Sequence, residues 1–393
     1  MFKFDKPRIS ETKRENISFA RRYNRQNNNG VIIGGIGCGK SLVMKKMIRD
    51  DHDYHGDSMQ QFIVHMNDTY EDVMGSIGGV SINISPENTA LMINPLYIDE
   101  SIYTAADYTT KLHDLYISEK TDLIINMVSI MLGKELDSSE KAIVSKSVLQ
   151  LLDLNKLFYE LKHGEYPSLK RLYNVILDEY DRTGNGTEIL GALDEINEIW
   201  PSIFNASKTN IGSVGTNIGS TVNYTFVIDA KPRDKRIVSL EILVISEAIM
   251  GFMRRNYMSQ IKSTMYLDNL DEMLETKNVT DIGTKFIMQQ LIEITKKSRP
   301  YAGGIVTSVS NIEDNDIGAM MYTLLCNSCY EILLHNTEDM LAFCKEMYKL
   351  SEFYIKQIDD EHVVKPGDGI WYAGADKWDA CKVTIDYHYG YVS

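Results

Sequence analysis

The chain has 393 residues, of which 44% are hydrophobic, and a formal net charge of −14. This length supports one large hydrophobic core or two linked domains, and the composition is that of a soluble globular protein. The negative charge argues against a broad basic surface for duplex DNA, although a local basic channel in an oligomer stays open. Five cysteines do not form the pattern of a disulfide framework, which favours a reducing, cytoplasmic compartment.

The N-terminal segment is basic and lacks an apolar period. The first 25 residues carry eight Lys or Arg against three acidic residues, so we expect residues 1–28 to form an arm or linker. Its charge could contact a membrane surface or a partner, but a solvated linker is the simpler interpretation. No signal peptide is expected, and the most apolar stretch, 237–253, is interrupted by Glu241 and Glu247 and is too short to span a membrane.

A glycine-rich loop follows the short β-branched run 31–33 and fits the pattern G-x-x-x-x-G-K-[ST]. The backbone N–H groups of such a loop wrap a phosphate, its Lys charge contacts the β and γ phosphates, and its Ser hydroxyl ligates Mg²⁺. The apolar spacing of 41–48 predicts a helix that opens at the loop. ATP and Mg²⁺ are therefore the expected ligands, against the alternative of an ordinary glycine-rich turn. The expected nucleotide-binding residues are Gly34, Gly35, Ile36, Gly37, Cys38, Gly39, Lys40 and Ser41.

The remaining elements predict an α/β fold with a helical interruption. Strands and helices alternate over 29–96 and again over 211–393, which indicates one parallel sheet built from both segments. Residues 97–210 have helical periodicity and few strand signals, so we expect an all-α insertion domain. The Gly-, Ser-, Thr- and Asn-rich stretch 205–223 would return the chain to the sheet. Expected strands are 61–64, 80–84, 224–229, 264–267, 304–308 and 330–334, expected helices are 121–132, 138–152, 168–180, 236–257 and 282–297, and a β-hairpin is expected within 367–389.

A phosphate loop needs an apolar strand that ends in Asp, and Met265 to Asp268 is the best candidate. The next residue is Asn269, whose amide can hold a water molecule but cannot take its proton. Asp271 and Glu272 follow within a turn and could substitute as the acid that polarises water. The simpler interpretation of both is a solvated helix start.

Taken together, these residues resemble the C-terminal ATPase half of the type IV secretion traffic ATPase family, which is related to RecA-like and HerA-like translocases. The similarity runs from about Asn29 to Tyr389. Beyond the phosphate loop and Asp268, it rests on Ile84-Ser85-Pro86, Ile93-Asn94-Pro95-Leu96, Phe226-Val227-Ile228-Asp229 and Asn311-Ile312-Glu313-Asp314. The resemblance implies a RecA-like P-loop NTPase sheet with an all-α insertion domain.

The resemblance also implies roles for single residues. Lys40 and Ser41 would bind phosphates and Mg²⁺, and Asp268 would hold a water molecule of the magnesium ion. Arg299 matches the arginine that is presented to a neighbouring subunit's nucleotide, although a surface Arg before Pro300 has an equally simple structural explanation. A homo-oligomeric ring of six subunits is implied by the resemblance alone.

The sequence departs from the family pattern at three places, and at each an acidic or phosphate-sensing side chain is replaced by a weaker one. Asn269 stands where the family has Glu, Ser310 where it has a γ-phosphate-sensing Gln, and His65-Met66-Asn67 where it has Asp-Pro-Glu. Nucleotide binding is therefore better supported than fast hydrolysis. The family's N-terminal half has no counterpart here, so we expect either a shortened form or a short, diverged relative.

The leading hypothesis is an ATP-dependent motor component of a type IV secretion or conjugation system. It would work with other subunits of that machinery at the cytoplasmic face of the membrane, with peripheral attachment through partners. A hydrolysis-impaired nucleotide-binding scaffold of the same machinery is the second hypothesis, and a HerA- or FtsK-like DNA translocase is the third. Cys326 and Cys329 have metal-ligand spacing but lack a second ligand pair, so no zinc site is expected.

Overall fold

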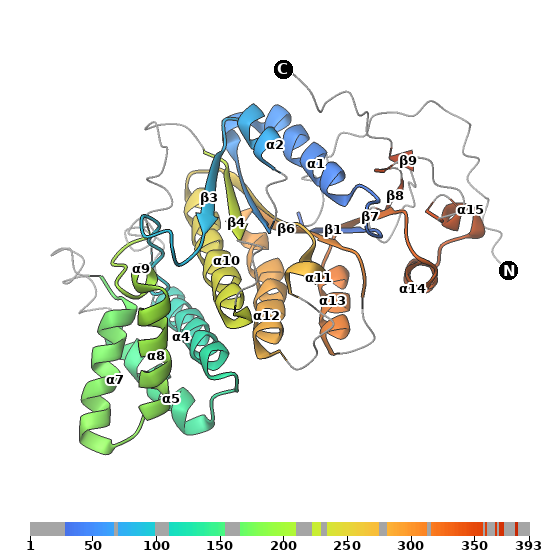
Figure 1. Ribbon diagram of the computed structural model, residues 1–393. Coiled ribbons are helices and arrows are strands. Elements are labelled where there is room, and N and C mark those ends of the chain that lie inside the picture. Colours follow the sequence, from blue (N-terminus) through green and yellow to red (C-terminus); the bar gives the residue numbers. More distant parts are fainter. Residues whose placement is uncertain are drawn as a thin grey trace.

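In the computed structural model of the protein, the described part of the chain forms a single sheet of nine strands, and Figure 1 shows this sheet with its helices. The order across the sheet is β3-β4-β2-β5-β6-β1-β7-β8-β9. Neighbours from β3 to β7 are parallel, while β7, β8 and β9 pair antiparallel. The strands are β1 Gly30–Ile33, β2 Met59–His65, β3 Val80–Ile84, β4 Tyr224–Ile228, β5 Lys262–Leu267, β6 Gly303–Val309, β7 Tyr330–Leu334, β8 Gly369–Tyr372 and β9 Lys382–Val383.

The structure describes residues 28–66, 70–98, 110–153, 166–209, 222–228, 234–274, 281–312, 316–356, 358–359, 366–367, 369–372 and 382–383. The expected N-terminal arm therefore lies outside the described residues, apart from Asn28. All seven strands expected before the C-terminal hairpin are present, and the hairpin is present as β8 and β9. The predicted parallel α/β sheet is confirmed, with an antiparallel edge at its C-terminal side.

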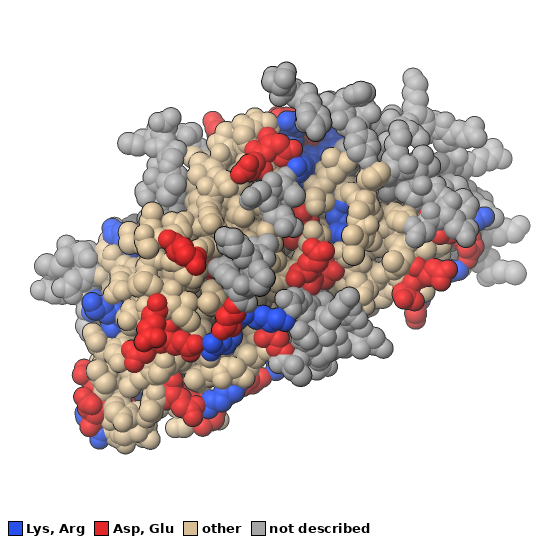
Figure 2. Space-filling model, in the orientation of Figure 1, with Lys and Arg blue, Asp and Glu red and all other residues tan. Residues whose placement is uncertain are grey.

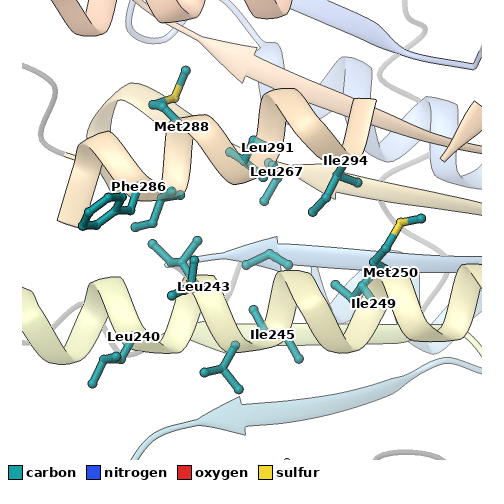
Figure 3. Close-up of a cluster of buried hydrophobic side chains, with 14 of the residues drawn as sticks. Leu240, Leu243, Ile245, Ile249, Met250, Leu267, Phe286, Met288, Leu291 and Ile294 are labelled. Carbon is teal, nitrogen blue, oxygen red and sulfur yellow. The ribbon is translucent and has the colours of Figure 1, made fainter. Parts of the chain in front are cut away.

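Both faces of the sheet are covered by helices, which explains why the parallel strands, apart from β3, are buried at nearly every position. On one face lie α1 (Lys40–His55) and α2 (Glu71–Ser76), packed on side chains such as Ile32 and Ile63. On the other face lie α10 (Lys235–Met258), α12 (Ile282–Lys297) and α13 (Asp316–Cys326). Figure 3 shows Leu243 and Ile249 of α10 close to Leu291 and Ile294 of α12 and to Leu267 of β5.

Every element described between β3 and β4 is helical, and Figure 1 shows these helices as a lobe below the sheet. Asp137 starts α5 with a capping box that includes Glu140, and Ser168 caps α7, whose end is marked by Gly184 in the left-handed conformation. The helix expected at 121–132 begins earlier. The helices are α4 Thr110–Leu132, α5 Ser138–Leu151, α7 Leu169–Thr183, α8 Thr187–Ile199 and α9 Pro201–Phe204.

Helix α10 lies between this lobe and the sheet, since it contacts α4 as well as β5. This position explains its apolar stretch, because the helix is buried on several sides. None of the described helices is long and apolar enough to cross a membrane. The remaining short elements are η2 Gly56–Ser58, α11 Leu270–Met273, η4 Arg299–Tyr301, α14 Glu338–Tyr348 and α15 Glu352–Ile355.

Candidate nucleotide-binding site

The glycine-rich loop leaves the carboxyl end of β1 and enters α1, between the carboxyl ends of β6 and β7. Two backbone bonds fix its start: Gly34 N–H donates to the Val309 carbonyl (3.1 Å), and Gly35 N–H donates to the His335 carbonyl (2.7 Å). Open parallel sheets bind ligands at the carboxyl ends of their strands, because the helix N-termini lie there as well.

Two glycines of the loop adopt positive φ, at 78° for Gly37 and 98° for Gly39. A Cβ on Gly39 would also lie 2.4 Å from the backbone nitrogen of Gly367, and Gly367 N–H donates to the Cys38 carbonyl at 2.6 Å. The loop therefore needs glycine at position 39 for two separate reasons. Burial raises the pKa of the Cys38 thiol, which keeps this side chain neutral, whereas Ile36 at the loop tip is 88% exposed.

The start of α1 is suited to a phosphate group. Gly39 occupies the N-cap without a side-chain cap, and the first turn contains no acidic residue. The first N–H groups of the helix and the positive end of its dipole are thus available to an anion. Lys40 is only 6% exposed, and its ammonium donates to the carbonyls of Gly34 (3.0 Å) and Gly35 (3.1 Å). The ammonium therefore lies directly at the loop.

Ser41 and Asp268 meet although they are 227 positions apart in sequence. The Ser41 hydroxyl donates to Oδ2 of Asp268 at 2.6 Å. A hydroxyl and a carboxylate beside a phosphate cradle form the donor set that Mg²⁺ uses in P-loop sites, where phosphates and water complete the coordination. Among the described residues there is no group of three or more His, Cys, Asp or Glu that could hold a metal by itself. The Ser41 hydroxyl and the Asp268 carboxylate fit a Mg²⁺ ion that is bound together with a nucleotide.

Two further hydroxyls hold the same carboxylate, and neither was predicted. Tyr70 donates to Oδ2 of Asp268 at 2.8 Å, and Ser308 donates to Oδ1 at 2.5 Å. Burial, with the negative charge of Asp268, raises the pKa of the Tyr70 hydroxyl well above its ordinary value, so this group remains a donor. The sequence feature that could have suggested both residues is their position at strand ends. Tyr70 follows β2 and Ser308 lies near the end of β6, and these strands lie beside those that carry Asp268 and the loop.

The residues after Asp268 turn sharply. Asn269 has φ 52° and ψ 55°, a left-handed conformation that Asn tolerates better than most side chains. Its N–H donates to the Ser308 hydroxyl at 2.7 Å. Asp271 accepts the Ser310 N–H at 2.9 Å, while the side chain of Glu272 is exposed. The structure therefore places Asp271 at the end of β6 and turns Glu272 toward solvent.

Arg299 lies near the amino ends of the parallel strands, whereas the phosphate loop lies at their carboxyl ends. It belongs to η4, which precedes the amino end of β6, whereas the phosphate loop follows the carboxyl end of β1. Its exposed guanidinium donates to the Asn327 side-chain oxygen at 3.2 Å and to the Asn327 carbonyl at 3.4 Å. Within one chain, therefore, Arg299 does not join the loop and Asp268.

The segment aligned with the family's Asp-Pro-Glu is only partly described. His65 is buried at the end of β2; its Nε2 lies 3.0 Å from the Thr225 hydroxyl, and its ring centroid lies 4.9 Å from that of Tyr70. The sequence-matched residues Asn67, Asp229, Glu313 and Asp314 lie outside the described residues.

The phosphate loop follows the central strand β1, and Asp268 follows β5, which is separated from β1 by β6. This arrangement, with Ser41 bonded to Asp268, defines a P-loop nucleotide-binding fold of the RecA-like kind. Comparison with known proteins agrees with this class: residues 16–189 match the family model for the TraG P-loop domain.

Three solved structures illustrate the similarity. VirB4 of Thermoanaerobacter pseudethanolicus superposes with a TM-score of 0.67 at 18% identity, covering 92% of this chain and 91% of that chain. The unbound monoclinic form of the bacterial conjugative coupling protein TrwBΔN70 gives 0.50 at 12% identity, covering 96% and 89%. TrwB with ADP and Mg²⁺ gives a TM-score of 0.44 at 13% identity, covering 86% and 78%. None of the curated proteins matches the sequence.

These findings confirm the resemblance and the RecA-like fold that the sequence predicted. The TraG P-loop match covers the phosphate loop and part of the helical region, and the VirB4 superposition extends over nearly the whole chain.

Proposed function

We propose that this chain is the ATP-binding motor ATPase of a type IV secretion or conjugative DNA-transfer machinery, and that it uses ATP binding and hydrolysis for assembly or substrate transport. The observation that carries the proposal is the 2.6 Å contact between Ser41 and Asp268 beside the buried Lys40. The TraG P-loop match and the fold shared with VirB4 support the choice of machinery. Its partners would be other subunits of that machinery, at the cytoplasmic side of the membrane.

In this proposal, the loop residues 34–41 bind the phosphates of ATP and Lys40 contacts the β and γ phosphates. Ser41 contacts Mg²⁺ directly, and Asp268 accepts from a water molecule of the ion. Bound Mg²⁺ supplies positive charge that offsets the charge of the phosphates. The helical region 97–210 is the insertion domain, and segments 29–96 and 211–393 together form the nucleotide-binding domain.

Lys40→Ala tests the proposal, because it removes the ammonium that bonds to the loop carbonyls and keeps the backbone N–H groups of the loop. We expect affinity for Mg-ATP to fall by about 100-fold, roughly 2.7 kcal/mol at 25 °C. Titration of a fluorescent ATP analogue into the parent and the variant measures this. Lys46→Ala, on the same helix but paired with Asp50 at 3.0 Å, is the matched control. Equal affinity of Lys40→Ala and the parent would reject the proposal.

A hydrolysis-impaired scaffold of the same machinery is the second candidate. It is favoured by the backbone at Asn269, since a left-handed residue with its N–H bound to Ser308 holds an amide at the family's Glu position. Steady-state hydrolysis separates the two candidates: turnover that depends on Lys40 supports the motor, and tight binding without turnover supports the scaffold. In the motor, Glu272 is our proposed acid, and Glu272→Gln would lower turnover while sparing ATP affinity.

A role for Arg299 requires a second subunit, because the residue lies at the amino ends of the strands and its own phosphate loop lies at their carboxyl ends. We therefore propose a homo-oligomer, of up to six subunits, in which Arg299 reaches the nucleotide of a neighbour. Subunits that carry Arg299→Ala and subunits that carry Lys40→Ala are each expected to lack turnover, and mixing them should restore part of it. Hydrolysis by mixed, co-purified assemblies is the measurement. Absence of recovery in an assembly shown to contain both variants would remove Arg299 from the mechanism.

A further inference from the structure

Tyr70 is a fully buried phenol whose hydroxyl reaches the carboxylate at the centre of the proposed site. It precedes α2, an element that carries no part of the phosphate-loop motif. The phenol therefore brings a third segment of the chain to Asp268, besides the loop and β5.

The two oxygens of Asp268 are held in different ways. Oδ1 accepts from Ser308 at 2.5 Å, while Oδ2 accepts from both Ser41 at 2.6 Å and Tyr70 at 2.8 Å. Ser41 is the residue that turns to a metal ion in a P-loop site. If it does so, Tyr70 and Ser308 still hold one carboxylate oxygen each. Two donors on opposite oxygens fix both the position and the plane of a carboxylate.

The ring of Tyr70 is itself held by its surroundings. Its centroid lies 4.9 Å from that of His65, and the ammonium of Lys45 lies 5.8 Å from the ring centroid. Lys45 pairs with Asp72 at 2.8 Å, which links α1 to α2 beside the ring. A side chain with so little freedom can direct its hydroxyl at one atom.

We propose that Tyr70 is a positioning residue for magnesium: it orients Asp268 toward the water molecules of a Mg²⁺ ion bound with the nucleotide. This inference rests on the proposed function, because it assigns Tyr70 a role in the same site. Tyr70 contacts neither nucleotide nor metal. It acts through Asp268, so its removal changes the dependence on Mg²⁺ more than the affinity for the nucleotide itself.

Tyr70→Phe removes the hydroxyl and keeps the ring. We expect the Mg²⁺ concentration that half-saturates binding of a fluorescent ATP analogue to rise by roughly tenfold, the usual effect of losing a group that orients a metal ligand. Affinity for the same analogue in EDTA should stay within about twofold of the parent. A role in packing alone would not separate these two measurements.

Tyr266→Phe is the matched control, because Tyr266 is also a buried phenol bonded to a carboxylate, that of Asp51, at 2.5 Å. It lies in the same hydrophobic cluster, and its partner carboxylate is not part of the site. Thermal unfolding of both variants shows the general effect of losing a buried phenol hydroxyl. An unchanged Mg²⁺ dependence in Tyr70→Phe, or an equal change in Tyr266→Phe, would overturn the proposal while leaving the proposed function intact.

Two further results need separate interpretation: a Tyr70→Phe variant that does not fold, and a parent protein that does not bind the analogue. If Tyr70→Phe fails to fold, Ser308→Ala removes the other donor, and Mg²⁺ half-saturation equal to that of the parent would then contradict the idea that second-layer hydroxyls orient Asp268. If the parent binds the analogue no better than Lys40→Ala does, the proposed function fails, and the role of Tyr70 fails with it.

Discussion

Replacing Glu331 with Gln is expected to stabilise the protein increasingly as the pH rises, by roughly 3 kcal/mol more at pH 8 than at pH 5. Glu331 lies in β7 between β1 and β8, only 5% of its surface is exposed, and its Oε2 has no hydrogen-bond partner among the described residues. Burial raises the pKa of this carboxyl to about 8 from an ordinary value of 4.5.

The direction of this pH dependence follows from whether the folded or the unfolded chain keeps the proton of Glu331. Below pH 4.5 the carboxyl of Glu331 is protonated in both the folded and the unfolded chain, and it adds no pH dependence. Between pH 4.5 and about 8, the unfolded chain loses this proton while the folded chain retains it. The free energy of unfolding therefore falls across this interval, and it stops falling once both states are ionised.

Denaturant unfolding at half-unit steps from pH 5 to pH 8.5, followed by circular dichroism, measures the effect. Glutamine keeps the shape of the side chain and cannot ionise, so the curve of the variant should be flatter than that of the parent. Glu346→Gln, at an exposed position of α14, is the control and should follow the parent. Parallel curves for Glu331→Gln and the parent would show that Glu331 does not titrate in this range.

The second large effect is expected at Arg254, where Arg254→Met should lower the free energy of unfolding by about 3–5 kcal/mol. Its guanidinium bonds to Glu119 of α4, and the two side chains are 6% and 7% exposed. Nearby, Lys120 pairs with Glu247 at 2.8 Å, and Lys297 lies 3.3 Å from Glu119.

This network of ion pairs joins α4 of the helical lobe to α10 and α12 on the sheet, beside a hollow of about 270 Å³. Burial lowers the pKa of the Arg254 guanidinium, but the charges of Glu119 and Glu247 outweigh it and raise the pKa overall. Removing Arg254 leaves Glu119 buried, and among the described residues its remaining ion-pair partner is Lys297, which is 36% exposed. The large expected loss follows because Glu119 loses its buried partner and keeps only a more exposed one.

Urea unfolding measures this loss, and the double variant Glu119→Leu with Arg254→Met should recover most of it, because no lone buried charge remains. On the face shown in Figure 2, acidic and basic side chains are interspersed, and exposed pairs of this kind contribute little. Lys285→Met breaks such a pair with Glu135, which is half exposed, and should change stability by less than about 1 kcal/mol. A similarly small effect of Arg254→Met would show that the buried network is not required.

Several elements could be placed from local pattern alone. The strands at 80–84 and 330–334 and the helix at 282–297 have the predicted bounds. Residues 80–84 alternate between apolar and polar, 330–334 are apolar except for Glu331, and 282–297 have the helical period. Helices α2 and α13 were not predicted. The first is six residues long and the second is mostly apolar, so neither shows a clear amphipathic period.

The departure at position 269 shows the limit of motif comparison. From sequence, Asn269 is a missing acid; in the structure, it is also the left-handed residue that turns the chain from β5 into α11. A glutamate would adopt that conformation less readily than asparagine. The asparagine therefore suits the turn at this position, which motif spacing cannot reveal.

The sequence by itself determined the phosphate loop, the Asp-terminated strand and the alternation of strands and helices. These are local properties, set by glycine conformation, by charge at a helix start and by apolar periodicity. Only the tertiary structure decided that Tyr70 and Ser308 hold Asp268, that Glu331 is buried and that Arg299 faces away from its own loop. Those facts depend on the order of strands in the sheet, and parallel strands are ordered by long-range packing between segments that local pattern does not pair.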